Sequence, residues 1–173
     1  MLESVRVFGL DPAIDAQVRV ESLVVEHQTK LTAFLRRFVG DRDTACDLAQ
    51  EVFVSAYAML RAEPARPLSA GWLFKSATNR AISYLRKRRH ATSELNDNVA
   101  GVRFDEATAL SLDVQAALAR LPATQVACVL LTAYAGYSSQ EAGLLLGISA
   151  DAVRQRVCRG LHAMRALLTE PAR

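Results

Sequence analysis

The helical spacing of the apolar residues restricts the fold of this chain more than any other feature of its sequence. The stretch from 43 to 60 shows it well, with an apolar residue at every third or fourth position: Ala45, Leu48, Ala49, Val52, Ala56, Met59 and Leu60. This spacing places the side chains on one side of an α-helix, where they can be buried together. Strand-like alternation is scarce, and alanine and leucine, which favour helix, dominate. The sequence therefore predicts an all-α fold.

Glycine and proline divide this pattern into separate helices. A first helix is predicted from Glu21 to about Val39, ended by Gly40, and a second runs to Leu60. Two prolines mark a loop over 63–68, after which Ser69 is a suitable N-cap for a third helix reaching about residue 89.

A polar stretch then separates this first set of helices from a second set. Helical periodicity fades from about 90 to 106, where serine, threonine, asparagine and glycine are frequent, and it resumes near Leu110. We therefore expect two small helical domains joined by a flexible linker, with the first dozen residues disordered. The expected boundaries are an N-terminal extension (1–19), a first domain (20–90), the linker (91–109) and a second domain (110–170).

The charged residues are unevenly distributed, although the net charge is only +3. One basic stretch contains Arg80, Arg86, Lys87, Arg88, Arg89 and His90, and a second contains Arg154, Arg156, Arg159 and Arg165. An acidic stretch contains Asp41, Asp43, Asp47 and Glu51. This distribution suggests nucleic acid as the partner in two places and a different partner in the third.

Several classes of protein are disfavoured by what the sequence lacks. No apolar run reaches the roughly 18 residues of a membrane span, and no secretory signal is recognisable. The three cysteines are far apart and form no C-x-x-C pair, which argues against a disulfide framework or a closed zinc site. P-loop, H-E-x-x-H and G-x-S-x-G motifs are absent. We expect a cytoplasmic protein that does not insert into membranes, with no catalytic residue, metal or cofactor.

The segment from 138 to 169 has the layout of a helix-turn-helix. Ser138 and Glu141 have the spacing of a capping box, in which each side chain bonds to the backbone of the other residue. Gly147 ends the short helix that follows, and Ser149 can cap the next one. Two helices joined by such a short glycine-containing turn form the motif that many DNA-binding proteins use.

The second of these helices has two distinct faces. One face is expected to be buried and carries Val153, Val157, Gly160, Leu161 and Met164. Gln155, Arg159 and His162 project the opposite way, with Arg154 and Arg156 on the flanks. Glutamine and arginine suit base edges in the major groove, and flanking arginines suit phosphates. The alternative is an ordinary amphipathic helix whose polar face meets only solvent.

Two sets of motifs, in order along the chain, resemble one known family. Leu121-Pro122, Gly136-Tyr137-Ser138 and Leu146-Gly147-Ile148-Ser149, followed by the arginine-bearing helix, are similar to region four of extracytoplasmic-function (ECF) sigma factors of bacterial RNA polymerase. Asp47-Leu48-Ala49-Gln50-Glu51-Val52-Phe53 matches the D-L-x-Q-E-x-F core of sigma region two, and the stretch from Trp72 to Asn79 matches its W-L-x-x-x-A-x-N segment. One departure is Gly143, where the family usually has alanine. Glycine inside a helix costs about 1 kcal/mol relative to alanine, so such a departure could loosen the first helix of the motif or mark a divergent promoter preference.

The resemblance implies three binding surfaces. The first docks on the clamp helices of the largest polymerase subunit and comprises Asp43, Asp47, Gln50, Glu51 and Val54. The second holds the minus-ten promoter strand with the loop over 63–69 and with Asn79, Arg80, Arg86, Lys87 and Arg88. The third reads the minus-thirty-five element with Ser138, Arg154, Gln155, Arg156 and Arg159, while its domain touches the flap of the second-largest subunit. Trp72 is expected to pack in the core rather than stack on a flipped base.

The resulting expectation is a sigma factor that binds core RNA polymerase and initiates transcription of a specific regulon. An anti-sigma protein is the further partner that the family implies. Two alternatives stay open at this stage. One is a stand-alone helix-turn-helix regulator, which a stable homodimer and a palindromic operator would indicate. The other is a sigma-like decoy for an anti-sigma protein.

Overall fold

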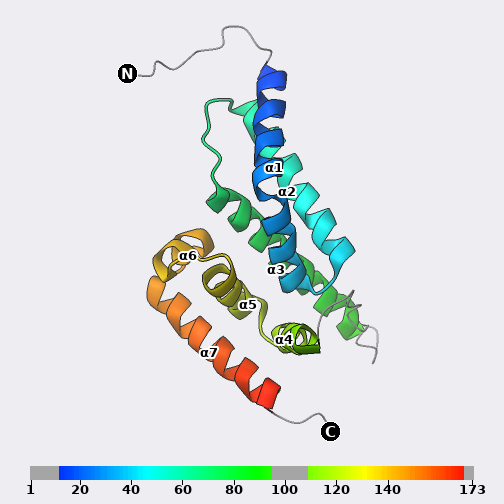
Figure 1. The fold of residues 1–173 in the computed structure, drawn as a ribbon, viewed down its shortest axis with the longest axis vertical. Coiled ribbons are helices and arrows are strands. Elements are labelled where there is room, and N and C mark those ends of the chain that lie inside the picture. The colour runs from blue at the N-terminus through cyan, green and yellow to red at the C-terminus, as the bar shows by residue number, and fades with distance from the viewer. Residues whose placement is uncertain (1–11, 95–108, 170–173) are drawn as a thin grey trace.

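The computed structural model describes residues 12–94 and 109–169, and it contains only helices in these residues. In chain order they are α1 (Pro12–Val39), α2 (Arg42–Ala62), α3 (Ala70–Glu94), α4 (Ala109–Ala119), α5 (Ala123–Val129), the π-helical turn η1 (Leu130–Tyr134), α6 (Ser139–Leu146) and α7 (Ala150–Thr169). The all-α prediction is confirmed. Figure 1 shows α1, α2 and α3 packed together, with α4 to α7 gathered below them and to the left of the lower part of α3.

The first three helices enclose a core of aromatic and aliphatic side chains. Phe34 of α1 is fully buried and meets Phe38 and Phe74 edge-on, at ring-centroid distances of 6.0 and 5.2 Å. The chain reverses between α1 and α2 at Gly40, whose φ of +84° suits a glycine. Asp41 then caps α2 by accepting a hydrogen bond from the backbone N–H of Thr44 at 2.8 Å.

The last four helices form a second, smaller unit in which α5 packs against α7 (Figure 1). α7 approaches α5 closely at Gly160, where a Cβ would lie 2.9 Å from Cγ2 of Val129. α5 continues directly into η1, whose wider turn is closed by a hydrogen bond from the N–H of Ala135 to the carbonyl of Leu130 at 2.9 Å. The sequence did not predict this π-helical turn.

Two helices extend beyond their predicted ends. α1 begins at Pro12 instead of Glu21, and α3 continues to Glu94 instead of ending near 89. Residues 12–19, assigned from the sequence to an extension, are therefore helical. Ala16 in this part is only 1% exposed, so tertiary packing stabilises a turn whose own apolar pattern is weak. The first eleven residues and the linker residues 95–108 lie outside the described part of the chain.

The two units also contact each other. The rings of Phe74 in α3 and Tyr137, which precedes α6, meet edge-on with centroids 5.7 Å apart. The guanidinium of Arg37 in α1 lies 4.1 Å from the ring centroid of Tyr134. The side-chain amide of Gln115 in α4 donates to the carbonyl of Arg37 at 2.9 Å. A single cluster of buried residues consequently runs through both units, which the sequence could not predict.

Candidate DNA-binding and polymerase-binding surfaces

The helix-turn-helix forms as its local chemistry predicts. The hydroxyl of Ser138 accepts from the N–H of Glu141 at 3.2 Å, and the Glu141 carboxylate accepts from the N–H of Ser138 at 2.8 Å. Hydrogen bonds to the Glu141 carboxyl from the Ser138 side chain and from the Ser138 backbone N–H lower the pKa of Glu141, because they stabilise its ionised form. Gly147 ends α6 in the left-handed conformation, and the Ser149 hydroxyl accepts from the N–H of Ala152 at 3.1 Å. The capping box, the glycine stop and the second cap are confirmed.

Gly143 explains one departure from the family pattern. A Cβ built at this position in α6 would lie 2.7 Å from the backbone carbonyl oxygen of Ile148, closer than real Cβ atoms approach. The turn between α6 and α7 therefore folds back tightly over the glycine. Neither expectation from the sequence, a loosened helix or a divergent promoter preference, includes this role, because a close backbone approach is invisible in the sequence.

The outward face of α7 is polar and accessible. Gln155 and Arg159 are exposed, and the Nε of Arg159 donates to the carbonyl of Gln155 at 3.4 Å. Arg154 is exposed beside them and pairs with Asp151 in the first turn. Four of the five residues predicted for the buried face do pack inward. Leu161 is 48% exposed, so its assignment to that face is wrong.

Arg156 differs from the other arginines of this helix. It is half-buried, and its guanidinium lies against the thiol of Cys128 in α5. Burial raises the pKa of that thiol, and the positive charge and hydrogen bond of Arg156 oppose the rise only in part. Arg156 is thus placed toward the packing of α5 on α7, at the edge of the exposed face.

The outward face of α2 carries all five side chains predicted to bind polymerase. Asp43, Asp47, Gln50, Glu51 and Val54 are exposed. Val54 is 66% exposed, so this face presents one aliphatic side chain among its polar groups. The opposite stripe is buried as expected, except that Met59 is half-buried and Phe53, which was not assigned to it, is only 8% exposed.

The predicted minus-ten residues do not form one cluster. The guanidinium of Arg80 is held between α2 and α3 by the Glu51 carboxylate at 3.2 Å, by the Ser76 hydroxyl at 2.7 Å and by the Ser55 hydroxyl. Arg80 therefore joins the α3 surface to the α2 surface. The other members of the set are exposed along α3: Asn79, Arg86, Lys87 and Arg88. Trp72, near the start of α3, is half-buried and packs against the core.

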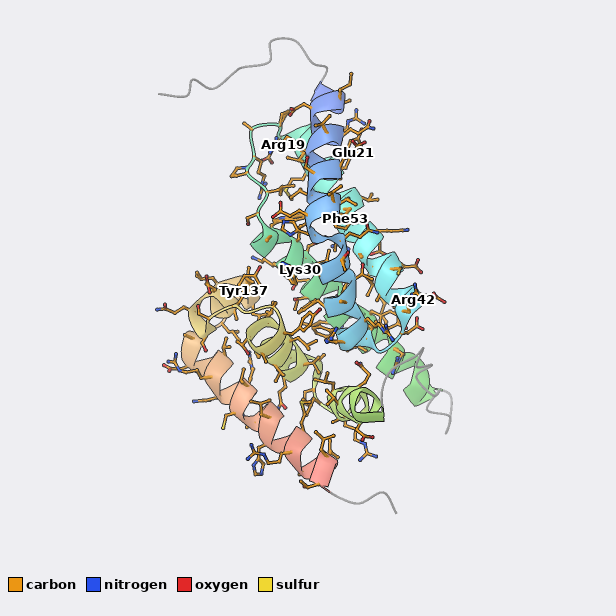
Figure 2. The ribbon with its side chains drawn as sticks, viewed as in Figure 1. Arg19, Glu21, Lys30, Arg42, Phe53 and Tyr137 are labelled. Atoms are coloured by element: carbon orange, nitrogen blue, oxygen red, sulfur yellow. The ribbon has the colours of Figure 1, made fainter. Side chains whose placement is uncertain are left out.

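The loop between α2 and α3 is fastened to α1 by a residue that the sequence did not single out. The guanidinium of Arg19 donates to the backbone carbonyl of Pro64 and, at 2.9 Å, to that of Arg66. Figure 2 labels Arg19 on the upper part of α1, beside this loop. Ser69 closes the loop as the predicted cap of α3, since its hydroxyl accepts from the N–H of Trp72 at 3.4 Å.

Comparison with known proteins assigns both units. Residues 23–91 match the family described as sigma-70 region 2, and residues 111–164 match sigma-70 region 4. The chain is 34% identical over 161 residues to the RNA polymerase sigma factor CarQ of Myxococcus xanthus, covering 90% of this chain and 92% of CarQ. It also matches the ECF RNA polymerase sigma factor SigE of Mycolicibacterium smegmatis, at 28% identity over 161 residues, covering 87% of this chain and 62% of that protein. The chain belongs to the ECF sigma factors. This sigma factor is a transcription initiation factor and not an enzyme.

Solved structures agree with this assignment. The fold of this sigma factor is similar to that of CnrH in complex with the cytosolic domain of CnrY, with a TM-score of 0.66 and 30% identity over 91% of this chain and 94% of the other. It is also similar to RpoE in complex with the anti-sigma factor NepR from Bartonella quintana, with a TM-score of 0.70, 23% identity, and coverage of 88% and 98%. The second likeness concerns the fold alone.

Two absences hold for the residues that the structure describes. None of their helices is both long and apolar enough to cross a membrane. Within the same ranges, no group of three or more histidine, cysteine, aspartate or glutamate side chains could hold a metal ion.

Proposed function

We propose that this sigma factor carries core RNA polymerase to promoters through three separate surfaces. The outward face of α2 docks on the clamp helices of the largest subunit. The loop over 63–69 and the exposed basic side chains of α3 hold the unpaired minus-ten strand. The outward face of α7 reads the minus-thirty-five element as duplex DNA, while its domain touches the polymerase flap. Binding energy drives melting, so no covalent step is needed.

The observation that carries this proposal is the exposure of all three surfaces on a sigma-70 fold. Acids, an amide and one aliphatic side chain on α2 suit a basic protein surface better than DNA. Basic side chains that track the backbone, together with a pocket for an unpaired base, are one way in which proteins hold single strands. Arg80 is left out of the proposed DNA contact, because its guanidinium already bonds to Glu51, Ser55 and Ser76.

Transcription in vitro with core polymerase tests the proposal as a whole. We expect the full chain to direct starts from specific sites in a promoter library, which core polymerase alone does not do. A stand-alone regulator would bind DNA but would not direct transcription starts. A decoy would bind an anti-sigma protein but would neither bind promoter DNA nor direct starts. Either result would contradict the proposal.

The anchor on polymerase can be tested separately. Replacing Asp47 and Gln50 with alanine should leave the fold intact, because both side chains are exposed. Affinity for core polymerase should fall by about 2 kcal/mol, the size of an interface hot spot. The matched control replaces Glu21 and Gln28 of α1, an exposed acid and an exposed amide on another helix. Undiminished binding by the folded α2 double variant would remove the proposed anchor.

The reading face of α7 makes a different prediction for each kind of contact. Gln155→Ala or Arg159→Ala should relax selection at one upstream base pair, by about 1–3 kcal/mol for a bidentate contact. Arg154→Ala should instead weaken binding to every sequence and flatten its dependence on salt, as loss of a phosphate contact does. Affinities for a set of upstream variants at two salt concentrations separate the two classes. If all three variants weakened the affinity for every DNA site by the same factor, α7 would contact only the DNA backbone.

We also propose that an anti-sigma protein controls this sigma factor. RpoE, whose fold it shares, was solved in complex with the anti-sigma factor NepR, and CnrH, also similar in fold, was solved in complex with the cytosolic domain of CnrY. Co-purification of the chain with the product of a neighbouring gene, and repression of its transcription by that product, are the expected results. Constitutive activity in cells and no binding by any such product would contradict this part.

A further inference from the structure

The first turns of α1 reach a loop that follows them by more than forty residues. Arg19 donates from both terminal nitrogens of its guanidinium, one to the carbonyl of Pro64 and the other to that of Arg66. The carboxylate of Asp15, one turn earlier on α1, lies 3.8 Å from Nη1 of this guanidinium, the nitrogen that donates to Pro64. Arg19 precedes the segment that matches sigma-70 region 2, which begins at residue 23.

The chemistry of arginine explains why this residue type fits the site. Its planar guanidinium presents several donors in a fixed fork, so it can bond two acceptors at once. Pro64 and Arg66 are two positions apart, and their carbonyls both accept hydrogen bonds from this one guanidinium. Lysine has the same charge but presents a flexible point donor, which cannot reproduce the paired geometry.

Other contacts already restrict the backbone of this loop, and the bonds from Arg19 add to them. The N–H of Arg66 donates to the carbonyl of Glu63 at 3.0 Å, and their side chains form an ion pair at 3.2 Å. Pro64 and Pro67 have restricted backbones. The far end is fixed at Ser69, where α3 begins. The loop is therefore one shaped unit, held at two carbonyls by α1.

We propose that Arg19 is a positioning residue for recognition of the minus-ten strand. It makes no contact with DNA. It holds the loop over 63–69 in the shape that receives the unpaired base, and so the N-terminal turns of α1 belong to the promoter-reading surface. This inference rests on the function proposed for the loop.

The test uses the full chain with core polymerase on a promoter library randomised in both the minus-ten and the minus-thirty-five segments, with transcripts counted by sequencing. Arg19→Ala and Arg19→Lys should both flatten the preference at minus-ten positions, by about fivefold for the alanine variant, the effect of about one exposed hydrogen bond. Preference at the minus-thirty-five element serves as an internal reference and should not change. Hydrogen exchange of the loop amides should accelerate in the same variants.

Lys30→Ala is the matched control, since Lys30 is an exposed cation of the same helix (Figure 2) and should change neither preference. A purely structural role for Arg19 would lower transcription from every minus-ten sequence alike and be rescued by lysine. That result, or an unchanged minus-ten preference in Arg19→Ala, overturns the inference. A wild-type chain that shows no minus-ten preference would instead overturn the proposed function.

Discussion

Replacing Gly143 with alanine, the residue that the family usually has there, should destabilise this protein. The new Cβ would lie 2.7 Å from the carbonyl oxygen of Ile148, and that oxygen belongs to the backbone of the turn. Moving backbone to relieve such overpacking costs about 1–3 kcal/mol. The gain in helix propensity returns up to about 1 kcal/mol. With an overpacking cost in the middle of that range, about 2 kcal/mol, and the full propensity gain, we expect a net loss of about 1 kcal/mol in the free energy of unfolding.

Urea unfolding followed by circular dichroism measures this change, and Gly71→Ala is the matched control. Gly71 is also helical, but its Cβ would meet only ordinary contacts, 3.5 Å from side-chain atoms of Leu145 and Ser69. That variant should be neutral or more stable by up to about 1 kcal/mol. If Gly143→Ala were as stable as the wild type or more so, the inferred close approach of the turn would be refuted.

Three further predictions follow from other contacts. Gly160→Ala should cost about 1–3 kcal/mol in urea unfolding, since its Cβ would lie 2.9 Å from a stiff valine of α5; an unchanged midpoint would contradict it. Ser138→Ala should lose about 1 kcal/mol at neutral pH. The Ser138 side chain also lowers the pKa of Glu141, so the part of the stabilisation that depends on ionised Glu141 is complete above the ordinary glutamate pKa and is lost as the pH falls through the lowered one. Thermal unfolding of both proteins at several pH values should show the difference shrinking in acid, and a constant difference would count against it. Iodoacetamide should label exposed Cys158 in the native protein and spare Cys128, whose pKa is raised by burial; mass spectrometry showing equal labelling would contradict this.

The features predicted correctly from the sequence depend on neighbours within a few positions. The bonds of Ser138 with Glu141 and of Ser149 with Ala152 each span three residues, so local residue types are enough to indicate them. The stripe of α2 is similar, because helical periodicity alone decides which side chains share a face.

The features that were missed depend on distant parts of the chain. The early start of α1 is supported by Arg19, whose partners lie 45 and 47 positions away. Arg80 was grouped with the DNA-binding side chains, yet its partner Glu51 lies 29 positions away on α2. Leu161 projects roughly 100° round the helix from buried Gly160, and only the placement of the facing helices decides that it stays exposed.

The π-helical turn η1 determines how far the residues at its end are rotated about the helix axis relative to those of α5. Its i to i−5 hydrogen bond, from the N–H of Ala135 to the carbonyl of Leu130, encloses one residue more than an α-helical turn does. A chain shortened by one residue within η1 could close the turn as ordinary α-helix. Tyr134 would then rotate by about 100° about the axis and leave the guanidinium of Arg37. The single extra residue thus places Tyr134 on the side of the helix that faces Arg37 of the first unit.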